Sequence, residues 1–241
     1  MNRFFVDKSQ ICDGKAVVTG DDAAHIARVL RLERGDEVEL CDGEGGEYSA
    51  AIESADRKQV ELSVSPRRES TAEPECRITL FQCLPKSGKL ELIIQKCVEL
   101  GIYEIAPVTS KRCVVKLDGK DMGARMERYN RVAYEAAKQS KRGRIPRVRE
   151  VASLDGCDFS SYDDVFVAYE CERELTLKTA LDEKRPKSAA LIIGPEGGFE
   201  PEEVAALEKR GACAITLGNR ILRTETAGMA ATAMMLCLLE G

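Results

Sequence analysis

Residues 188–198 read SAALIIGPEGG, a short apolar run that passes directly into a loop with three glycines. An apolar run of this length, bounded by turn residues, is typical of a buried strand. The next residues, Glu200-Pro201-Glu202-Glu203, are typical of a helix N-terminus, because proline fits the first turn and acidic side chains favour the positive end of the helix dipole. The stretch therefore predicts a buried strand, a Gly-rich loop and a helix.

The same alternation continues on both sides of this stretch. Apolar runs at 77–84, 104–110, 163–170 and 214–218 predict strands, and helical spacing predicts helices at 90–100 and about 121–140. Gly101 closes the first of these helices, and Thr224 is expected to cap a final helix. Strands that alternate with helices predict an α/β fold with a mainly parallel sheet over residues 76–241. Ligands bind such sheets beyond the carboxyl ends of the strands.

The N-terminal part of the chain follows a different pattern. Segments 35–43, 46–54 and 58–66 read as short strands separated by Gly-rich turns, and one short helix is expected from Asp22 to Leu30. A polar segment, 67–75, follows and contains Pro74, which is typical of a linker. We therefore expect two domains, a small β-barrel over residues 1–70 and the α/β domain over 76–241.

The charge of the chain is unevenly distributed. The net charge of −5 over 241 residues argues, at face value, against a nucleic-acid partner. By segment, however, the net charge is −5 for residues 1–70, +7 for 71–150 and −7 for 151–241. Residues 138–149 hold six cations and no anion. Most charge runs are solvated surface, but this one predicts contact with phosphates of a nucleic-acid backbone.

Other residue types narrow the class of protein and of chemistry. No uncharged apolar run is long enough to span a bilayer and the N-terminus has no signal-peptide core, so we expect a cytoplasmic protein. The ten cysteines form no CxxC pair, which favours buried thiols over disulfides and predicts no metal site. His25 is the single histidine, and no GxSxG motif accompanies it. The chemistry is therefore expected to proceed without imidazole.

Three loops at predicted strand ends hold the candidate chemistry. GPEGGF (194–199) is neither a phosphate-binding Walker loop nor a dinucleotide fingerprint, and it fits either a ligand cradle or a tight turn. LGNRILRTETA (217–227) places Arg223, Thr224 and Glu225 at a helix N-terminus, as a ligand site or as ordinary capping. The third loop begins at Ala168-Tyr169-Glu170.

These motifs together resemble the RsmE family of SPOUT methyltransferases, which methylate N3 of a uridine in 16S ribosomal RNA. The resemblance extends from residue 1 to 241 and includes LPKSGK with ELIIQKCVELG, MNRFFVD and HIARVLRLERGD. It implies an N-terminal PUA-like barrel that binds RNA and a C-terminal domain tied in a deep trefoil knot. It also implies S-adenosylmethionine as cofactor, the small ribosomal subunit as partner, and a homodimer.

Roles for individual residues follow from the chemistry of this reaction and from the resemblance. We hypothesise that Arg223 stabilises the developing uracil oxygen, with Glu196 or Glu225 as the base. The alternative is that both acids only cap helices. The cofactor-binding residues are expected to be Ala168, Tyr169, Glu170, Ile193, Gly194, Pro195, Glu196, Gly197, Gly198, Leu217, Gly218, Asn219, Ile221, Leu222, Arg223 and Thr226. Contacts to RNA are expected from Arg3, Arg28 and Arg31 in the barrel, and from Arg112, Lys138, Lys141, Arg142, Arg144 and Arg147 in the catalytic domain.

The sequence is also compatible with two other functions. One is methylation of the 2′-oxygen of a ribose by another type of SPOUT enzyme. The other is an RNA-binding assembly factor without catalytic activity. The intact loops 194–199 and 217–227 argue against the loss of cofactor binding.

Overall fold

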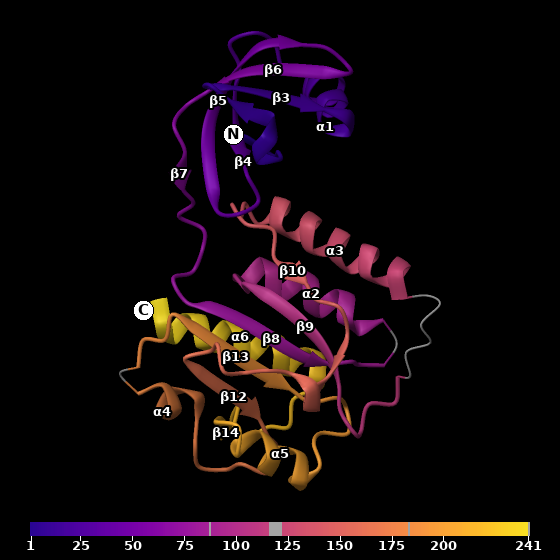
Figure 1. The fold of residues 1–241 in the computed structure, drawn as a ribbon, viewed down its shortest axis with the longest axis vertical. Helices are drawn as coiled ribbons and strands as arrows, with labels where there is room; N and C mark the ends of the chain where they lie inside the picture. Colours follow the sequence, from indigo (N-terminus) through magenta and orange to yellow (C-terminus); the bar gives the residue numbers. More distant parts are fainter. Residues whose placement is uncertain (87, 116–121, 183, 241) are drawn as a thin grey trace. The chain divides into compact units, whose positions relative to one another are not determined.

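The computed structural model describes residues 1–86, 88–115, 122–182 and 184–240, and the chain divides into two compact units (Figure 1). Unit 1 is Met1–Glu73 together with Ala137–Ile145, and unit 2 is Pro74–Ala136 together with Pro146–Gly241. Within the described residues, no helix combines the length and the hydrophobicity that crossing a bilayer requires.

Unit 1 is built on a sheet of seven strands with the order β1-β4-β5-β6-β3-β2, and β7 pairs with β5. Strands β1 and β4 are parallel, and the other pairs are antiparallel. The strands are β1 (Asn2–Phe5), β2 (Ile11–Cys12), β3 (Lys15–Thr19), β4 (Glu37–Cys41), β5 (Gly46–Ala55), β6 (Gln59–Val64) and β7 (Arg68–Glu69).

The alternating sequence of these strands places apolar side chains on one face of the sheet. Phe4, Leu40, Ile52 and Leu62 are buried in one cluster, and their neighbours along the strands are more exposed, except for the buried Cys41 at the end of β4. Helix α1 (Gly20–Ala24) continues into a π-helical turn over His25–Leu30, which confirms the expected helix.

Segment 137–145 belongs to unit 1, although its cations were expected in the catalytic domain. Lys138 forms an ion pair with Asp22, and Arg142 forms one with Glu73. Both acids lie in the N-terminal part of the chain, so these pairs attach the segment to unit 1. In the structure, Lys138, Lys141, Arg142 and Arg144 therefore lie in compact unit 1.

Unit 2 contains a fully parallel sheet with the order β10-β9-β8-β13-β12-β14, in which β11 also pairs with β9. Its strands are β8 (Arg77–Cys83), β9 (Glu104–Thr109), β10 (Arg147–Val148), β11 (Ala152–Ser153), β12 (Asp164–Ala168), β13 (Ser188–Ile193) and β14 (Ala212–Ile215). Its helices are α2 (Lys89–Leu100), α3 (Met122–Gln139, whose last residues belong to unit 1), α4 (Leu177–Leu181), α5 (Pro201–Glu208) and α6 (Thr224–Glu240). The predicted α/β fold with a parallel sheet is confirmed.

The strand order brings three loops to one edge of this sheet. Strand β12 lies between β13 and β14, so that Ala168 pairs with Ile193 on one side and with Ile215 on the other. These three residues end their strands, and the chain leaves the sheet at Ile215, earlier than the expected end at 218. Because all three strands are parallel, the loops that follow them emerge side by side. Helices α2 and α6 pack against each other, and α6 contacts β8 and β13 (Figure 1).

Candidate active site

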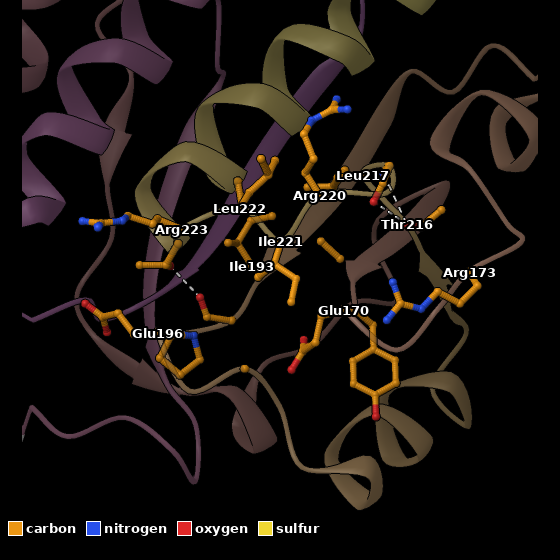
Figure 2. Close-up of a pocket in the computed structure, with 18 of the residues that line it drawn as sticks. Glu170, Arg173, Ile193, Glu196, Thr216, Leu217, Arg220, Ile221, Leu222 and Arg223 are labelled. Carbon is orange, nitrogen blue, oxygen red and sulfur yellow. Dashed lines mark hydrogen bonds between the residues drawn. The ribbon is translucent and has the colours of Figure 1, made fainter.

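A cavity of about 420 Å³ lies where β12, β13 and β14 end, within unit 2 (Figure 2). All three loops identified in the sequence contribute to its walls. The lining residues are Lys89, Ala168, Tyr169, Glu170, Arg173, Ile193, Gly194, Pro195, Glu196, Gly198, Thr216, Leu217, Gly218, Arg220, Ile221, Leu222, Arg223, Thr224 and Ala227.

The glycines of the loop after β13 let the backbone pass close to the cavity. Gly198 has φ +68°, and a Cβ atom there would collide with Oε1 of Glu170. The Gly198 N–H donates to the Pro195 carbonyl at 3.0 Å, which closes a tight turn. This loop is therefore both a tight turn and a wall of the cavity. Glycine suits position 198, because it adopts a positive φ without strain and has no side chain to meet Glu170.

The hydroxyl of Thr224 links the start of α6 to β8 and to the loop after β13. It donates to the Gly194 carbonyl at 2.6 Å and accepts from Nε2 of Gln82 at 2.9 Å. Gln82 is fully buried in β8, and among the described residues its Oε1 has no hydrogen-bond partner. Thr224 was expected to cap α6, but its side chain instead joins β8 to the loop after β13.

Lys89 bridges the two candidate bases. Its Nζ lies 3.1 Å from Oε1 of Glu225 and 3.8 Å from Oε1 of Glu196, whose carboxylate also accepts the Lys86 N–H at 3.0 Å. The backbone N–H of Glu225 lowers the pKa of its own carboxyl group against the effect of burial, and Lys89 lowers it further. The Glu225 carboxylate is therefore held ionised, which makes it a weak proton acceptor.

Three arginines occupy the rim of the cavity. Figure 2 shows Arg173, Arg220 and Arg223 on different sides of it, with the apolar side chains of Ile193, Ile221 and Leu222 between them. No guanidinium of these three makes a hydrogen bond or ion pair to the residues that the structure describes. The cavity lining thus combines apolar side chains with four cations, Lys89, Arg173, Arg220 and Arg223, and two carboxylates, Glu170 and Glu196.

Most of the predicted cofactor-binding residues line this cavity. Three of the predicted residues, Gly197, Asn219 and Thr226, do not line it. The Gly197 carbonyl accepts a hydrogen bond from Arg112, and Asn219 and Thr226 are exposed. Lining residues missing from the prediction are Lys89, Arg173, Thr216, Arg220, Thr224 and Ala227. Lys89, Arg220, Thr224 and Ala227 lie within the quoted motifs, so the motifs themselves were the signal, whereas Arg173 and Thr216 follow only from the strand order.

The structure separates the predicted RNA-binding residues into two groups. Arg28, Arg31, Lys141 and Arg147 are exposed. The remaining side chains are engaged within the protein: Arg3 with Glu39 and Glu47, Lys138 with Asp22, Arg142 with Glu73, Arg144 with the Glu44 carbonyl, and Arg112 with Glu200.

Arg142 is only 2% exposed, so the expectation that it contacts RNA is corrected. Its guanidinium lies 2.5 Å from Oε2 of Glu73, and Oε1 of the same carboxylate accepts the N–H groups of Gly143 and Arg144 at 3.0 Å. The cation therefore stabilises a folded turn, because a guanidinium buried against a carboxylate is not available to a phosphate.

The cysteines are all free thiols, and four of them are buried. Within the described part of the chain, no group of three or more His, Cys, Asp or Glu residues is arranged to hold a metal ion. Cys113 is distinct from the others, because a hydrogen bond from the Cys83 thiol and others from Ser110 lower its pKa to about 6 against burial.

Family models and curated relatives match both parts of this chain. A model of the RNA methyltransferase domain matches residues 72–236, and a model of the RNA methyltransferase PUA domain matches residues 18–65. Ribosomal RNA small subunit methyltransferase E of Bacillus subtilis is 36% identical over 94% of this chain and 93% of its own length. The protein of the same name from Mycobacterium bovis is 35% identical over 95% of this chain and 88% of its own.

A solved structure shares the whole fold. The crystal structure of a ribosomal RNA small subunit methyltransferase E from Neisseria gonorrhoeae bound to S-adenosyl methionine superimposes with a TM-score of 0.82. The two sequences are 29% identical, and the match covers 99% of this chain and 98% of the other. On the domain matches, the sequence identities and the shared fold, the chain belongs to the ribosomal RNA small subunit methyltransferase E family.

Proposed function

We propose that the protein transfers a methyl group from S-adenosylmethionine to N3 of a uridine in the 16S RNA of the small ribosomal subunit, in the cytoplasm. The observation that carries this proposal is the cavity at the ends of β12, β13 and β14, which is lined by the two motifs that the sequence shares with the family. Membership of the family supports the reaction and the substrate class.

The residues of the cavity fit this cofactor. The apolar side chains of Ile193, Ile221 and Leu222 would contact the adenine, and the backbone of Gly194 and Gly218 would provide polar groups at its edge. When bound, S-adenosylmethionine supplies an activated methyl group on its sulfonium. The knot that the family resemblance implies is part of this proposal, because it would join these loops into one site.

The charged residues of the cavity would control the proton on uracil N3. Arg223 would stabilise negative charge on the uracil oxygen as N3 loses its proton. Glu196 is the better candidate for the base, because it lines the cavity, whereas Glu225 lies outside the lining and its pKa is lowered. Lys89, between the two carboxylates, would keep both oriented.

The reaction is tested by incubating the purified protein with 16S RNA or small subunits and labelled S-adenosylmethionine, followed by mass spectrometry of the nucleosides. We expect 3-methyluridine. A 2′-O-methyl nucleoside would assign the chain to the other type of SPOUT enzyme, and the absence of both methylation and cofactor binding would favour an assembly factor. Glu196→Gln should slow methyl transfer far more than Glu225→Gln, with S-adenosylmethionine still bound.

We also propose that the protein is a homodimer in which α6 contributes to the interface. Between Glu225 and Glu240 this helix contains no charged residue, and Met234 and Cys237 are exposed on its outer side. A second copy of the chain would cover these apolar side chains. Analytical ultracentrifugation should show a dimer, and Met234→Glu should dissociate it.

A further inference from the structure

The arginines on the rim of the cavity are not explained by contacts within the protein. Three other arginines of unit 2 form ion pairs with acids: Arg112 with Glu200, Arg128 with Glu91 and Arg149 with Glu104. Among the described residues, the guanidinium groups of Arg173, Arg220 and Arg223 form no hydrogen bond or ion pair, although the charge of Arg223 helps to lower the pKa of Glu225. Exposed cations that surround a cavity raise the local potential and attract anions.

The loops that present two of these arginines are held together. The Tyr169 N–H donates to the Ile215 carbonyl at 3.0 Å, and the Thr216 N–H donates to the Leu175 carbonyl at 2.8 Å. These bonds join the loop after β12, which contains Arg173, to the end of β14, which leads to Arg220. Both arginines are therefore presented from adjoining loops.

The turn that contains Arg173 is itself ordered. The carboxylate of Glu172 accepts the N–H groups of Arg173, Glu174 and Leu175 at 2.8–3.0 Å through Oε1. Within the described residues, this carboxylate therefore holds the backbone of the turn and forms no ion pair with the Arg173 guanidinium. A pre-ordered backbone lowers the entropy that is lost when the side chain binds a ligand.

The charge of the proposed cofactor does not account for these cations. S-adenosylmethionine has one carboxylate, one ammonium and one sulfonium, so its net charge is positive. Its single carboxylate could pair with at most one guanidinium. Glu170 and Glu196 also line the cavity, but among the described residues neither forms an ion pair with Arg173 or Arg220. Two anionic groups of a further ligand at the rim would match these two arginines. Arginine is particularly suited to phosphate, which it binds through two parallel hydrogen bonds.

We infer that Arg173 and Arg220 bind the backbone phosphates on either side of the target nucleotide, so that its base enters the cavity while the strand stays at the rim. This inference rests on the proposed function, because it requires an RNA substrate at this cavity. Methyltransferases that modify a base must take it out of the stack, since the reacting atom is otherwise inaccessible. Two phosphates held at the rim would fix the nucleotide in this extruded position, while Arg223 remains available to the base.

The test compares two double variants that lose the same charge. Arg173→Ala/Arg220→Ala removes the proposed phosphate contacts, and Lys178→Ala/Lys209→Ala removes two exposed cations of unit 2 that do not line the cavity. Binding of transcribed 16S RNA is measured over a series of KCl concentrations, and binding of S-adenosylmethionine is measured by calorimetry. Methylation rates at increasing RNA concentration then separate KM from kcat.

We expect the arginine variant to lower the log–log salt slope of RNA binding by about 1.4, because each phosphate contact on a single strand contributes about 0.7. Its KM for RNA should rise at least tenfold, and its affinity for S-adenosylmethionine should stay within twofold. The lysine variant should resemble the wild type. Arg173→Lys/Arg220→Lys should retain most of the slope, because it keeps both charges.

Two results would overturn the inference. One is an unchanged salt slope in the arginine variant. The other is a large loss of S-adenosylmethionine affinity with normal RNA binding, which would assign the arginines to the cofactor carboxylate. Failure of the proposed function would give a different result from these two, because the wild-type protein itself would then not methylate RNA.

Discussion

The hydroxyl of Thr224 connects two buried groups in unit 2. It accepts from Gln82 in β8 and donates to the Gly194 carbonyl in the wall of the cavity. Thr224 itself is only 4% exposed, so water cannot replace it easily. A side chain of the same shape without the hydroxyl would leave both partners unsatisfied.

We therefore predict that Thr224→Val lowers the free energy of unfolding by about 1–3 kcal/mol, the usual cost of buried polar groups without partners. It should also weaken S-adenosylmethionine binding, because the loop at Gly194 loses its anchor. Urea unfolding and calorimetric titration measure the two effects. Thr224→Ser keeps the hydroxyl and should restore cofactor binding; valine and serine variants with equal affinity would contradict this role.

Cys113 is the thiol for which the structure predicts unusual reactivity. A hydrogen bond with the Cys83 side chain and bonds with Ser110, whose N–H donates to the Cys113 sulfur at 3.4 Å, lower the pKa of Cys113 to about 6. The Cys113 thiol is also placed to donate to the Leu84 carbonyl at 3.8 Å. Because the thiolate is the nucleophile, Cys113 is expected to be reactive at pH 7 and to lose reactivity as the pH falls through 6.

Alkylation with iodoacetamide across pH 5–9, followed by peptide mass spectrometry, measures this reactivity. Cys12 is an internal control, because it is exposed but Asp13 raises its pKa. Cys113 should be labelled before Cys12 at pH 7, and Ser110→Ala should move its midpoint to higher pH. Equal labelling of both thiols at pH 7 would show that the hydrogen bonds do not hold the thiolate.

At the scale of elements, the connection between β13 and α5 depends on glycine. Gly198 has φ +68° and lies against the carboxylate of Glu170. Alanine there would adopt a left-handed conformation at a cost of about 1–2 kcal/mol. The carboxylate of the exposed Glu170 would also have to move away from the added methyl group. We predict that Gly198→Ala weakens S-adenosylmethionine binding in calorimetry while the protein stays folded by circular dichroism.

The matched control is Gly156→Ala, because its φ is not in the left-handed region and a Cβ atom there meets no atom within 4 Å. This variant should bind S-adenosylmethionine as the wild type does. Normal binding by Gly198→Ala would mean that the loop can rearrange around the added methyl group.

The segment 137–145 is attached to unit 1 by a buried ion pair. The side chain of Arg142 is 3% exposed, and the Glu73 carboxylate that it contacts also accepts two N–H groups of the same turn. Without Arg142, the Glu73 carboxylate loses its counter-ion but keeps two backbone N–H donors and is 16% exposed. We predict that Arg142→Ala lowers the free energy of unfolding in urea by about 1–3 kcal/mol, the usual cost of a lost hydrogen bond to a charged group.

The same substitution should leave the salt dependence of RNA binding unchanged under conditions in which the variant is still folded, because the Arg142 guanidinium is buried. Lys141→Ala serves as the comparison, since Lys141 is the exposed neighbour and its removal should not affect stability. A stable Arg142→Ala protein with a lower salt slope would reverse this assignment.

At the scale of the whole molecule, the net charge of −5 is the sum of two acidic segments, 1–70 and 151–241, and one basic segment, 71–150. Three of the six cations of the basic stretch form ion pairs with acids elsewhere in the chain: Lys138 with Asp22, Arg142 with Glu73 and Arg149 with Glu104. The charges that remain for a polyanion are therefore fewer than the sequence suggests. In unit 1 they include Arg28, Arg31 and Lys141, which are all exposed.

We predict that Arg28→Ala/Arg31→Ala/Lys141→Ala weakens binding of 16S RNA and lowers its log–log salt slope by about 0.7 for each phosphate that is no longer neutralised. Methyl transfer at saturating RNA should be nearly unchanged, because these residues belong to unit 1, whereas the cavity is formed within unit 2. Filter binding over a KCl series measures the slope, and Lys15→Ala/Lys58→Ala, which removes other cations of unit 1, is the control. A slope equal to that of the wild type would remove unit 1 cations from the RNA contact.

Much of unit 2 could be predicted from local sequence. The strand at 188–193, the helix that begins at Pro201 and the helix that ends before Gly101 all follow from apolar periodicity and from the residues that start or end helices. The cavity-lining loops were identified because each follows a predicted strand, and in the loop 194–199 because glycines directly follow that strand. Gly197, Asn219 and Thr226 were expected at the cofactor but lie outside the lining, because proximity in sequence does not determine which residue faces the cavity.

Local sequence was sufficient to specify the α/β class, the Gly-rich loops at strand ends and the family resemblance, because periodicity, turn residues and motifs are local properties of the chain. Only packing in three dimensions determines which distant groups meet. Lys138 pairs with an acid 116 residues away, and Gln82 bonds to Thr224 across 142 residues. Such pairings depend on strand order and packing. In the basic run 138–149 they engage Lys138, Arg142, Arg144 and Arg149 within the protein and leave Lys141 and Arg147 exposed.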